Sequence, residues 1–304
     1  MRNRALAVEN INLKEVMLAT SAAVERVLDG VLTVPNTPEA RVFEAMRYAV
    51  YAGGKRIRPL LVLASAELFG VERAHALRVA AALECVHCYS LIHDDLPAMD
   101  DDDVRRGKAT VHIAFDEATA ILAGDALLTL AFEILADEET HPDPYVRTEL
   151  VTALARASGG HGMVGGQMID LSAADHALDQ QSIFRLQMMK TGALISFAVE
   201  AGAIIARTGR HARGSLHGYA RDLGLAFQIA DDLLDVEGDA SELGKAVGKD
   251  AQAGKATLVG MLGVERARQQ AQMLADQAID HLSDFDDKAA LLRAVAYFAV
   301  NRSS

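Results

Sequence analysis

The chain has 304 residues, of which 51% are apolar and 24% charged, and its formal net charge is −12. This balance is typical of a globular protein, and it excludes a disordered chain and a broad nucleic-acid-binding surface. The N-terminal segment lacks the continuous apolar core of a secretory signal, so we expect a cytoplasmic protein. The longest apolar stretch, residues 192–206, is interrupted by Glu200 and is shorter than the roughly 20 residues that span a bilayer. We interpret it as a buried helix and expect no stable membrane insertion.

Apolar residues recur at three- and four-residue spacing along most of the chain, which is typical of helices. No alternating apolar–polar run is long enough to predict a sheet. The expected helices cover residues 10–29, 39–51, 59–69, 73–95, 116–136, 145–158, 180–207, 215–237, 256–281 and 286–300. Breaks rich in glycine or proline separate them, at residues 53–54, 97, 141–144, 209–214 and 238–254. Because no linker-like boundary interrupts this pattern, we predict a single all-α domain over residues 1–304.

The first break continues into a basic segment, GGKRIRP, at residues 53–59. The two glycines permit an unusual backbone turn, and proline suits the first turn of the following helix. A helix N-terminus framed by Lys55, Arg56 and Arg58 is a suitable anion site. A salt-bridged loop at a helix start is the alternative interpretation.

The helix expected at residues 73–95 carries Cys85, His87 and Cys88. The two cysteines have C-x-x-C spacing, but no βαβ context and no second cysteine pair accompany them, so we interpret them as packed thiols. His87 lies seven residues before Asp94, on nearly the same helix face and roughly 10 Å away along the axis. We therefore expect His87 to face the same cavity as the acids that end this helix.

Aspartates gather where this helix ends, at Asp94, Asp95 and Asp100. Pro97 should break the helix and let Asp100 fold back toward Asp94. A cationic pair at residues 105–106 follows and lies beside the acids. The further acids between Asp100 and this pair fit a solvated surface.

A second cluster, Asp231, Asp232 and Asp235, lies in the helix expected at residues 215–237, with Gln228 before it. Asp231 and Asp235 are four residues apart on one helix face, and their apolar neighbours imply burial, which requires a cation. Carboxylate oxygens suit Mg²⁺, which fills its remaining positions with water and phosphate oxygens. The two clusters therefore predict metal binding, at two helix ends that could face each other across a cavity. Solvated acidic surface is the alternative.

These features together predict two diphosphate sites, a carboxylate–Mg²⁺ clamp and a basic pocket without metal. An enzyme needs both if it ionises one diphosphate ester and keeps the other intact. At this point six motifs in order resemble those of the trans-isoprenyl diphosphate synthases, of the bacterial farnesyl diphosphate synthase type. They are GGKRIRP, LIHDDLPAMDDDDVRRG, GGQMIDL, KTGALI, FQIADDLLD and the GKAVGKD…GKAT stretch.

The resemblance spans roughly residues 40–302 and implies an all-α helical bundle around a central active-site cavity, the isoprenoid synthase fold, as a homodimer. It implies three Mg²⁺ ions per active site, bound by Asp94, Asp95, Asp100 and Asp231 with its neighbours Asp232 and Asp235. The allylic diphosphate would be bound by Arg105, Lys190, Lys245 and Lys255. Isopentenyl diphosphate would be bound by Lys55, Arg58, His87 and Arg106. Thr191 and Gln228 would line the path of the allylic cation, whereas Gln167, Asp170 and Lys249 match the motifs without a defined role.

The implied reaction joins isopentenyl diphosphate to dimethylallyl and then geranyl diphosphate, head to tail, and gives farnesyl diphosphate. No general base stands out in the sequence, and the resemblance suggests that the departed diphosphate takes the proton. Tyr89, five residues before Asp94, would form the floor of the product cavity, although helical phase alone favours Ser90. A core tyrosine facing a neighbouring helix is the alternative for Tyr89.

Three other functions stay open. A geranylgeranyl diphosphate synthase of the same family differs only in product length. A terpene cyclase uses a single diphosphate substrate, which leaves the basic segment and His87 unexplained. A non-catalytic subunit of a heteromeric synthase need not keep its metal clamps, whereas both aspartate clusters are intact here.

Overall fold

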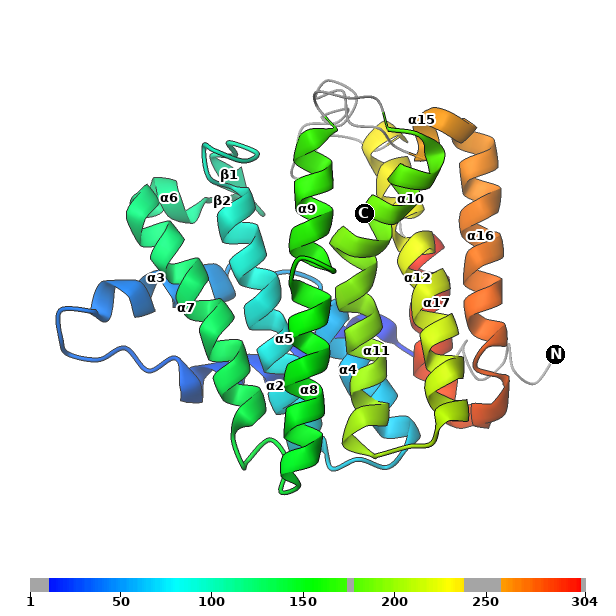
Figure 1. Ribbon diagram of the computed structural model, residues 1–304, viewed down its shortest axis with the longest axis horizontal. Helices are drawn as coiled ribbons and strands as arrows, with labels where there is room; N and C mark the ends of the chain where they lie inside the picture. Colours follow the sequence, from blue (N-terminus) through cyan, green and yellow to red (C-terminus); the bar gives the residue numbers. More distant parts are fainter. Residues whose placement is uncertain (1–10, 174–177, 238–257, 302–304) are drawn as a thin grey trace. The chain divides into compact units, whose positions relative to one another are not determined.

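The computed structural model describes residues 11–173, 178–237 and 258–301, and these residues are almost entirely helical (Figure 1). The chain divides into two compact units. The unit called here the N-terminal unit comprises Lys14–Leu63 and Glu72–Val151, and the C-terminal unit comprises Met1–Leu13, Ala64–Val71 and Thr152–Ser304. The all-α prediction is confirmed, whereas the prediction of one domain over residues 1–304 stays a prediction.

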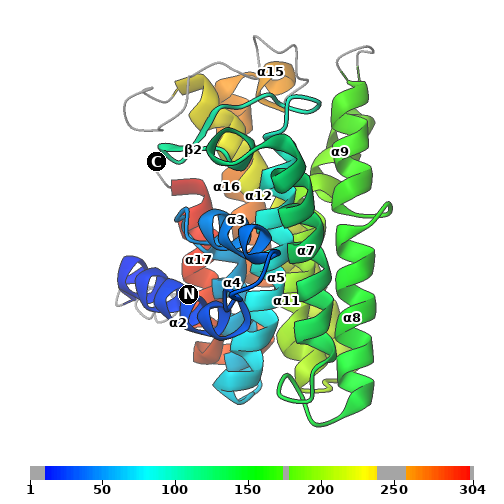
Figure 2. The same cartoon turned by 90° about the vertical axis from the view of Figure 1, so that its left-hand side faces the viewer.

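The N-terminal unit is built on two long helices that lie side by side in both views, α5 (Arg73–Asp94) and α7 (Glu117–Ala136) (Figures 1 and 2). The helix α5 is apolar on all sides, which is why it is buried along most of its length. The other elements of the N-terminal unit are α2 (Leu13–Val31), α3 (Ala40–Val50), α4 (Ile57–Leu68), β1 (Val104–Arg105), β2 (Lys108–Ala109), α6 (Val111–Ala114) and α8 (Pro144–Ser158). The helices α4 and α8 begin in this unit and end in the C-terminal unit.

The start of α7 is fixed by its capping residue, Asp116. Its carboxylate accepts hydrogen bonds from the Thr119 backbone N–H at 2.7 Å and from the Arg41 guanidinium at 2.7 Å. The Thr119 N–H is the main reason why the pKa of Asp116 falls to about 2. A charged cap at the N-terminus also interacts favourably with the helix dipole. The chain therefore enters α7 in one defined direction.

The C-terminal unit packs around two helices, α11 (Ala193–Ile205) and α12 (Arg210–Glu237). All but three residues of α11 are buried, which confirms the interpretation of this apolar stretch as a core helix. The remaining elements are α9 (Met163–Ser172), α10 (Gln180–Gln187), the π-helical η1 (Met188–Gly192), α15 (Leu258–Leu262), α16 (Val264–Asp280), η2 (Ser283–Ala289) and α17 (Ala290–Asn301).

Several features of the backbone differ from the sequence-based expectation. The helix α9 was not expected, because four glycines at residues 160–166 weaken the helical pattern. The break expected at residues 209–214 is wrong, since α12 already begins at Arg210. The helix expected at residues 256–281 is divided at Gly263, whose φ of 78° no α-helix contains. The β1–β2 hairpin was also missed, because two-residue strands show no alternating pattern.

Two helical stretches of the described residues are long and apolar enough to cross a membrane, Glu117–Ala136 and Gln180–Ile205. In their most apolar windows 44% and 61% of the residues, respectively, are buried inside the protein. Length and composition alone do not distinguish a membrane-spanning helix from the core helix of a globular protein.

Candidate active site

The basic segment forms a tight loop between α3 and α4. Gly53 and Gly54 have φ values of 90° and 126°, which side chains with a β carbon rarely adopt. Lys55 is exposed and Arg58 is half-buried at the start of α4. The two predicted anion ligands therefore lie at the N-terminal end of a helix, as the sequence indicated.

The β1–β2 hairpin positions the two arginines that follow the acidic cluster. Its two-residue turn consists of Arg106 and Gly107, with φ values of 52° and 74°, and positive φ at both positions is the mark of a type I′ turn. Arg106 donates a hydrogen bond to the Gly53 carbonyl, and a β carbon on Gly54 would lie only 2.5 Å from its guanidinium. Arg106 therefore contacts the basic loop at Gly53 and Gly54, and the φ of 126° at Gly54 favours glycine there.

Arg105 contacts the acidic end of α5 instead. Its Nη2 lies 2.5 Å from Asp95 Oδ1 and 3.7 Å from Asp102 Oδ2. The Asp95 side chain is 5% exposed, so this is a nearly buried ion pair. The hairpin thus directs two adjacent arginines to two different sites.

The chain folds back after Pro97 as predicted. The helix α5 ends at Asp94, and the backbone N–H of Asp100 donates to the Asp94 carbonyl at 2.9 Å. A second return bond joins the Asp102 N–H to the Asp95 carbonyl at 3.2 Å. The turn therefore brings Asp100 back to the end of the helix, as a site for a cation requires.

His87 lies among positive charges. Burial lowers its pKa well below 6.5, and the charges of Arg58, Arg106, Arg56 and Arg105 lower it further. The imidazole is therefore neutral at pH 7. A cluster of cations around a half-buried group is the electrostatic pattern of an anion-binding site.

Tyr89 is buried one turn before His93, and the two rings meet edge to face with their centroids 5.7 Å apart. Burial raises the pKa of Tyr89 to about 12, and the charge of Asp94 adds to this effect. The ring therefore lies close enough to the acidic end of α5 to interact with it electrostatically. The Ser90 hydroxyl donates to the His87 carbonyl at 2.9 Å.

In the C-terminal unit, Lys190 and Thr191 lie in the π-helical segment η1. Such segments frequently mark functional sites, because the extra residue changes the direction of the side chains. The Lys190 ammonium lies 2.5 Å from Asp170 Oδ2 on α9, and the Thr191 hydroxyl donates to Gln228 Oε1 at 3.1 Å. The structure therefore gives Asp170 a partner that the sequence did not assign.

Asp232 is the most enclosed of the second aspartate cluster, at 4% exposure. Its oxygens accept hydrogen bonds from Gln228 at 3.0 Å, from Gln187 at 3.4 Å and from the Leu258 backbone N–H at 3.3 Å. Asp231 and Asp235 are half-buried on a neighbouring stripe of α12. The cluster thus contains one carboxylate engaged by protein donors and two others of greater exposure.

Several predicted residues are not tested by this geometry. Lys245, Lys249 and Lys255 lie outside the described residues. Among residues 11–173, 178–237 and 258–301, no three His, Cys, Asp or Glu side chains form a preassembled metal site. Both amide atoms of Gln167 are buried without a hydrogen-bond partner in the described part of the chain.

Two buried polar residues that contact the basic loop and the second aspartate cluster were missed at the sequence level, Glu84 and Gln187. Glu84 is a buried acid within an apolar helix and pairs with Arg56, and Gln187 holds Asp232. An acid in the run AAALECVHC was the available signal for Glu84, since a buried carboxylate requires a partner.

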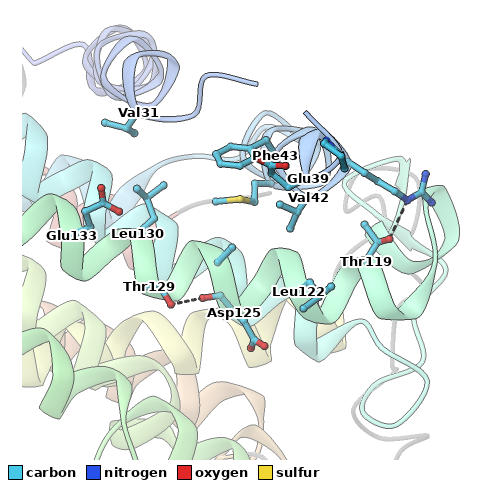
Figure 3. A pocket seen from close by; sticks show the side chains of 14 residues that line it. Val31, Glu39, Val42, Phe43, Thr119, Leu122, Asp125, Thr129, Leu130 and Glu133 are labelled. Atoms are coloured by element: carbon cyan, nitrogen blue, oxygen red, sulfur yellow. Dashed lines mark hydrogen bonds between the residues drawn. The ribbon is translucent and has the colours of Figure 1, made fainter. Parts of the chain in front are cut away.

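A separate hollow of about 770 Å³ lies on the N-terminal unit, away from the predicted site residues. Figure 3 shows apolar side chains on its walls, among them Phe43 and Val42 from α3 and Leu122 and Leu130 from α7. Acidic side chains, Glu39, Asp125 and Glu133, lie at its edges. Its lining carries no cluster of cations that would bind a diphosphate.

The polyprenyl synthetase family model matches residues 39–297. The chain belongs to this family. It is 48% identical to farnesyl diphosphate synthase of Escherichia coli (strain K12) over 280 residues, which cover 90% of this chain and 92% of that protein. It is 42% identical to geranylgeranyl diphosphate synthase of Cyanophora paradoxa over 298 residues, covering 97% and 98% of the two chains.

The solved structures agree with this family membership. The crystal structure of an FPP/GFPP synthase from Zymomonas mobilis, in its apo form, superimposes with a TM-score of 0.88 at 55% identity. The match covers 95% of this chain and 99% of that one. The predictions of the family, of the all-α fold and of a prenyltransferase are therefore confirmed. The assignment of individual site residues in this polyprenyl synthetase stays a prediction.

Proposed function

We propose that this chain condenses isopentenyl diphosphate with dimethylallyl and then geranyl diphosphate, and releases mainly farnesyl diphosphate. The observation that carries the proposal is the β1–β2 turn, which directs Arg105 to the acidic end of α5 and Arg106 to the basic loop. Adjacent arginines at an acidic site and at a basic site fit a reaction that treats two diphosphates differently. Relatives that are farnesyl diphosphate synthases support the same substrates.

In this proposal isopentenyl diphosphate binds at the basic site of the N-terminal unit, formed by Lys55, Arg58, His87 and Arg106. Neutral His87 donates one hydrogen bond without adding charge, and the guanidinium groups offer planar pairs of donors to phosphate oxygens. Isopentenyl diphosphate keeps its diphosphate because it is not allylic, so loss of that group would leave a primary cation without allylic stabilisation. Only its double bond then takes part in the reaction.

Each of the two aspartate clusters fits Mg²⁺ by the chemistry of its donors. Asp94 and Asp100 are joined by a backbone hydrogen bond, and Asp231 and Asp235 lie one helical turn apart. Mg²⁺ needs few protein carboxylates when diphosphate oxygens and water complete its shell. When bound, the ions supply charge that stabilises the leaving diphosphate.

The residues of the chain divide the remaining tasks. Arg105 and Lys190 neutralise the allylic diphosphate as its C–O bond ionises; the Lys190 ammonium has three donors, of which one is used by Asp170. Oxygen lone pairs of Thr191 and Gln228 face the developing allylic cation. We assign Asp232 the role of holding Gln228 rather than binding an ion, since its oxygens are engaged by protein donors. The departed diphosphate takes the proton.

The test of the proposal is product analysis of the purified chain with dimethylallyl and isopentenyl diphosphates, with Mg²⁺ and after its removal by chelation. We expect fifteen-carbon diphosphate, and none without the metal. A mainly twenty-carbon product would assign a geranylgeranyl diphosphate synthase, which relatives at 42% identity favour as the second candidate. Cyclised hydrocarbon from geranyl or farnesyl diphosphate alone, or no turnover by the isolated chain, would contradict the proposal.

The metal site has a matched set of variants. Asp94→Asn and Asp231→Asn should each lower kcat by about 10³-fold or more, because each removes a charged ligand opposite the leaving group. Asp101→Asn is the control, since the Asp101 side chain is exposed. A normal kcat and a normal Mg²⁺ dependence in either of the first two variants would remove that residue from the site.

We also propose that the chain works as a homodimer in the cytoplasm, with α7 in the interface. The helix α7 is apolar enough for a membrane, yet less than half of its apolar window is buried within the chain. Ile121 and Leu122 are 45% and 59% exposed, beside the apolar hollow of Figure 3. A second copy would cover this surface, and charged residues at its edge keep the rim soluble.

A further inference from the structure

Arg56 lies in the basic loop between two predicted diphosphate ligands, but it is buried. Its guanidinium is 0% exposed, whereas Lys55 is exposed and Arg58 is half-buried. Its φ is 49°, a left-handed conformation that is uncommon for a residue with a β carbon. A buried cation on a strained backbone requires specific partners.

The partners of Arg56 come from three helices, and one of them is Glu25 on α2, whose Oε1 lies 3.8 Å from Arg56 Nη2. Its Nη1 donates to Glu84 on α5, a carboxylate that is itself 2% exposed. Its Nη2 donates to the carbonyl of Val50, the last residue of α3. Its own carbonyl accepts the Leu60 N–H at 3.0 Å, which closes the first turn of α4. One residue therefore joins the end of α3, the start of α4 and the middle of α5.

We propose that Arg56, held by Glu84, is a positioning residue for isopentenyl diphosphate, an inference that rests on the function proposed above. The cations of the basic site come from different elements, Lys55 and Arg58 from the loop and His87 from α5. Glu84 lies three residues before His87, on the neighbouring face of the same helix. The Arg56–Glu84 pair therefore fixes the loop at a set distance from His87, and so fixes the size of the diphosphate site.

The stability of the fold alone does not explain why this buried ion pair is present. Replacing a buried ion pair by apolar side chains of similar volume is often neutral or stabilising, because both charges must otherwise be removed from water. Cys88 completes the buried group, since its Sγ lies 3.9 Å from Arg56 Nη1 and 3.9 Å from Glu84 Oε1. What the ion pair adds over an apolar contact is direction, because a guanidinium donates its hydrogen bonds only within its own plane.

The decisive variant is the double substitution Arg56→Met/Glu84→Met, which removes the pair without leaving either charge buried alone. We expect a cooperatively folded enzyme whose melting temperature is not reduced. Its KM for isopentenyl diphosphate should rise tenfold or more, toward that of Arg58→Ala, while the KM for dimethylallyl diphosphate stays within twofold. A residue with only a structural role would not separate the two KM values.

Arg78→Met serves as the matched control. Arg78 lies on α5, like Glu84, and is a largely enclosed cation. It pairs with Glu139 at 2.7 Å and with Asp137 at 3.4 Å. This variant should lose stability and leave both KM values unchanged. Arg56→Lys keeps the buried positive charge but loses the planar N–H donors of the guanidinium. We expect a three- to tenfold rise of the KM for isopentenyl diphosphate alone.

The inference is overturned if the folded double variant keeps the wild-type KM for isopentenyl diphosphate, or if both KM values rise together. Should the double variant not fold, Arg56→Lys decides, and an unchanged KM there overturns the inference as well. Failure of the proposed function is seen separately, as a wild-type chain that forms no carbon–carbon bond between the two substrates.

Discussion

The imidazole of His87 is surrounded by the guanidinium groups of Arg58, Arg106, Arg56 and Arg105. In the unfolded chain its pKa returns to about 6.5. Because the folded pKa lies below this value, the unfolded state binds more protons as the pH falls below about 6.5. The stability that neutral His87 confers is therefore present above that pH and is lost progressively below it.

His87→Gln should remove this part of the acid sensitivity. We expect the melting temperatures of wild type and variant to differ at pH 7.5 by an amount that shrinks, or reverses, as the pH falls to 5. Inorganic diphosphate should reduce the fall in the melting temperature of the wild type at low pH, since a bound anion favours protonated His87. This effect should be smaller in the variant. Parallel melting curves across this range would show that His87 does not carry the effect.

Tyr89 is the residue on which product length is predicted to depend. Its ring is buried and close-packed against His93, so it cannot yield volume to another five-carbon unit without strain of about 1–3 kcal/mol. Tyr89→Ala should shift the product from fifteen toward twenty or more carbons, measured by chromatography of the dephosphorylated products. The cavity costs roughly 3–5 kcal/mol of stability, so folding of the variant is checked by circular dichroism.

Ser90 provides the comparison at the neighbouring position. Ser90→Leu adds volume at the residue that helical phase places beneath Asp94, and we expect its product length to be unchanged. Shorter products from Ser90→Leu, together with an unchanged product distribution in Tyr89→Ala, would show that Ser90 and not Tyr89 forms the floor of the product cavity. The native activity would then have to be assigned without Tyr89.

The π-helical segment η1 depends on its contact with α9. A β carbon on Gly166 would lie 2.3 Å from the Lys190 backbone nitrogen and 2.7 Å from its Cα, which are backbone atoms that cannot rotate away. The two elements therefore approach as closely as they do only because position 166 is a glycine. The same contact places Lys190 within reach of Asp170, one helical turn further along α9.

Gly166→Ala should push η1 away from α9 and displace Lys190 and Thr191 together. We expect a loss of stability of about 1–3 kcal/mol and a fall in kcat of at least tenfold, measured by denaturant unfolding and steady-state kinetics. Gly160→Ala is the control, because Gly160 has open space where its β carbon would be. Equal effects of the two substitutions would mean that the loss at position 166 does not arise from this contact.

The exposed face of α7 leads to a prediction for the assembled protein. Leu122→Glu introduces a charge on a 59% exposed apolar residue beside the hollow of the N-terminal unit. If a second copy covers this face, the variant should fall from dimer to monomer in light scattering coupled to size-exclusion chromatography. Met273→Glu, at a 46% exposed position on α16, should leave the mass unchanged. A monomeric wild type, or a Leu122→Glu dimer of unchanged stability, would contradict the interface.

Helical periodicity was enough to predict most of the helices and the all-α class. The long apolar faces of α5, α7 and α11 repeat at helical spacing over several turns, and such patterns are a local property of the chain. Proline and the acidic run likewise predicted the return of Asp100 to Asp94. The helix α9 was missed, because glycine is a poor helix former unless packing against another backbone requires it.

The chemistry proposed for the site rests on residue types, because carboxylates, guanidinium groups and their order along the chain carry it. Asp94, Arg105 and Lys190 were named from residue type and motif alone, and the family comparisons agree with the enzyme class. The contacts that these side chains make could not be predicted from the sequence. Lys190 pairs with Asp170, and Asp232 is engaged by Gln187, Gln228 and Leu258, over sequence separations that no local pattern encodes.

Arg56 shows the difference most clearly. As a sequence feature it is one of three cations in GGKRIRP and looks equivalent to its neighbours. In the structure it is buried against Glu84, while Lys55 is exposed and Arg58 is half-buried. The residue types and their spacing by themselves determined the helices, the two aspartate clusters and the basic loop. Only tertiary structure decided which charges meet each other, because burial of a charge depends on partners that are distant in the chain.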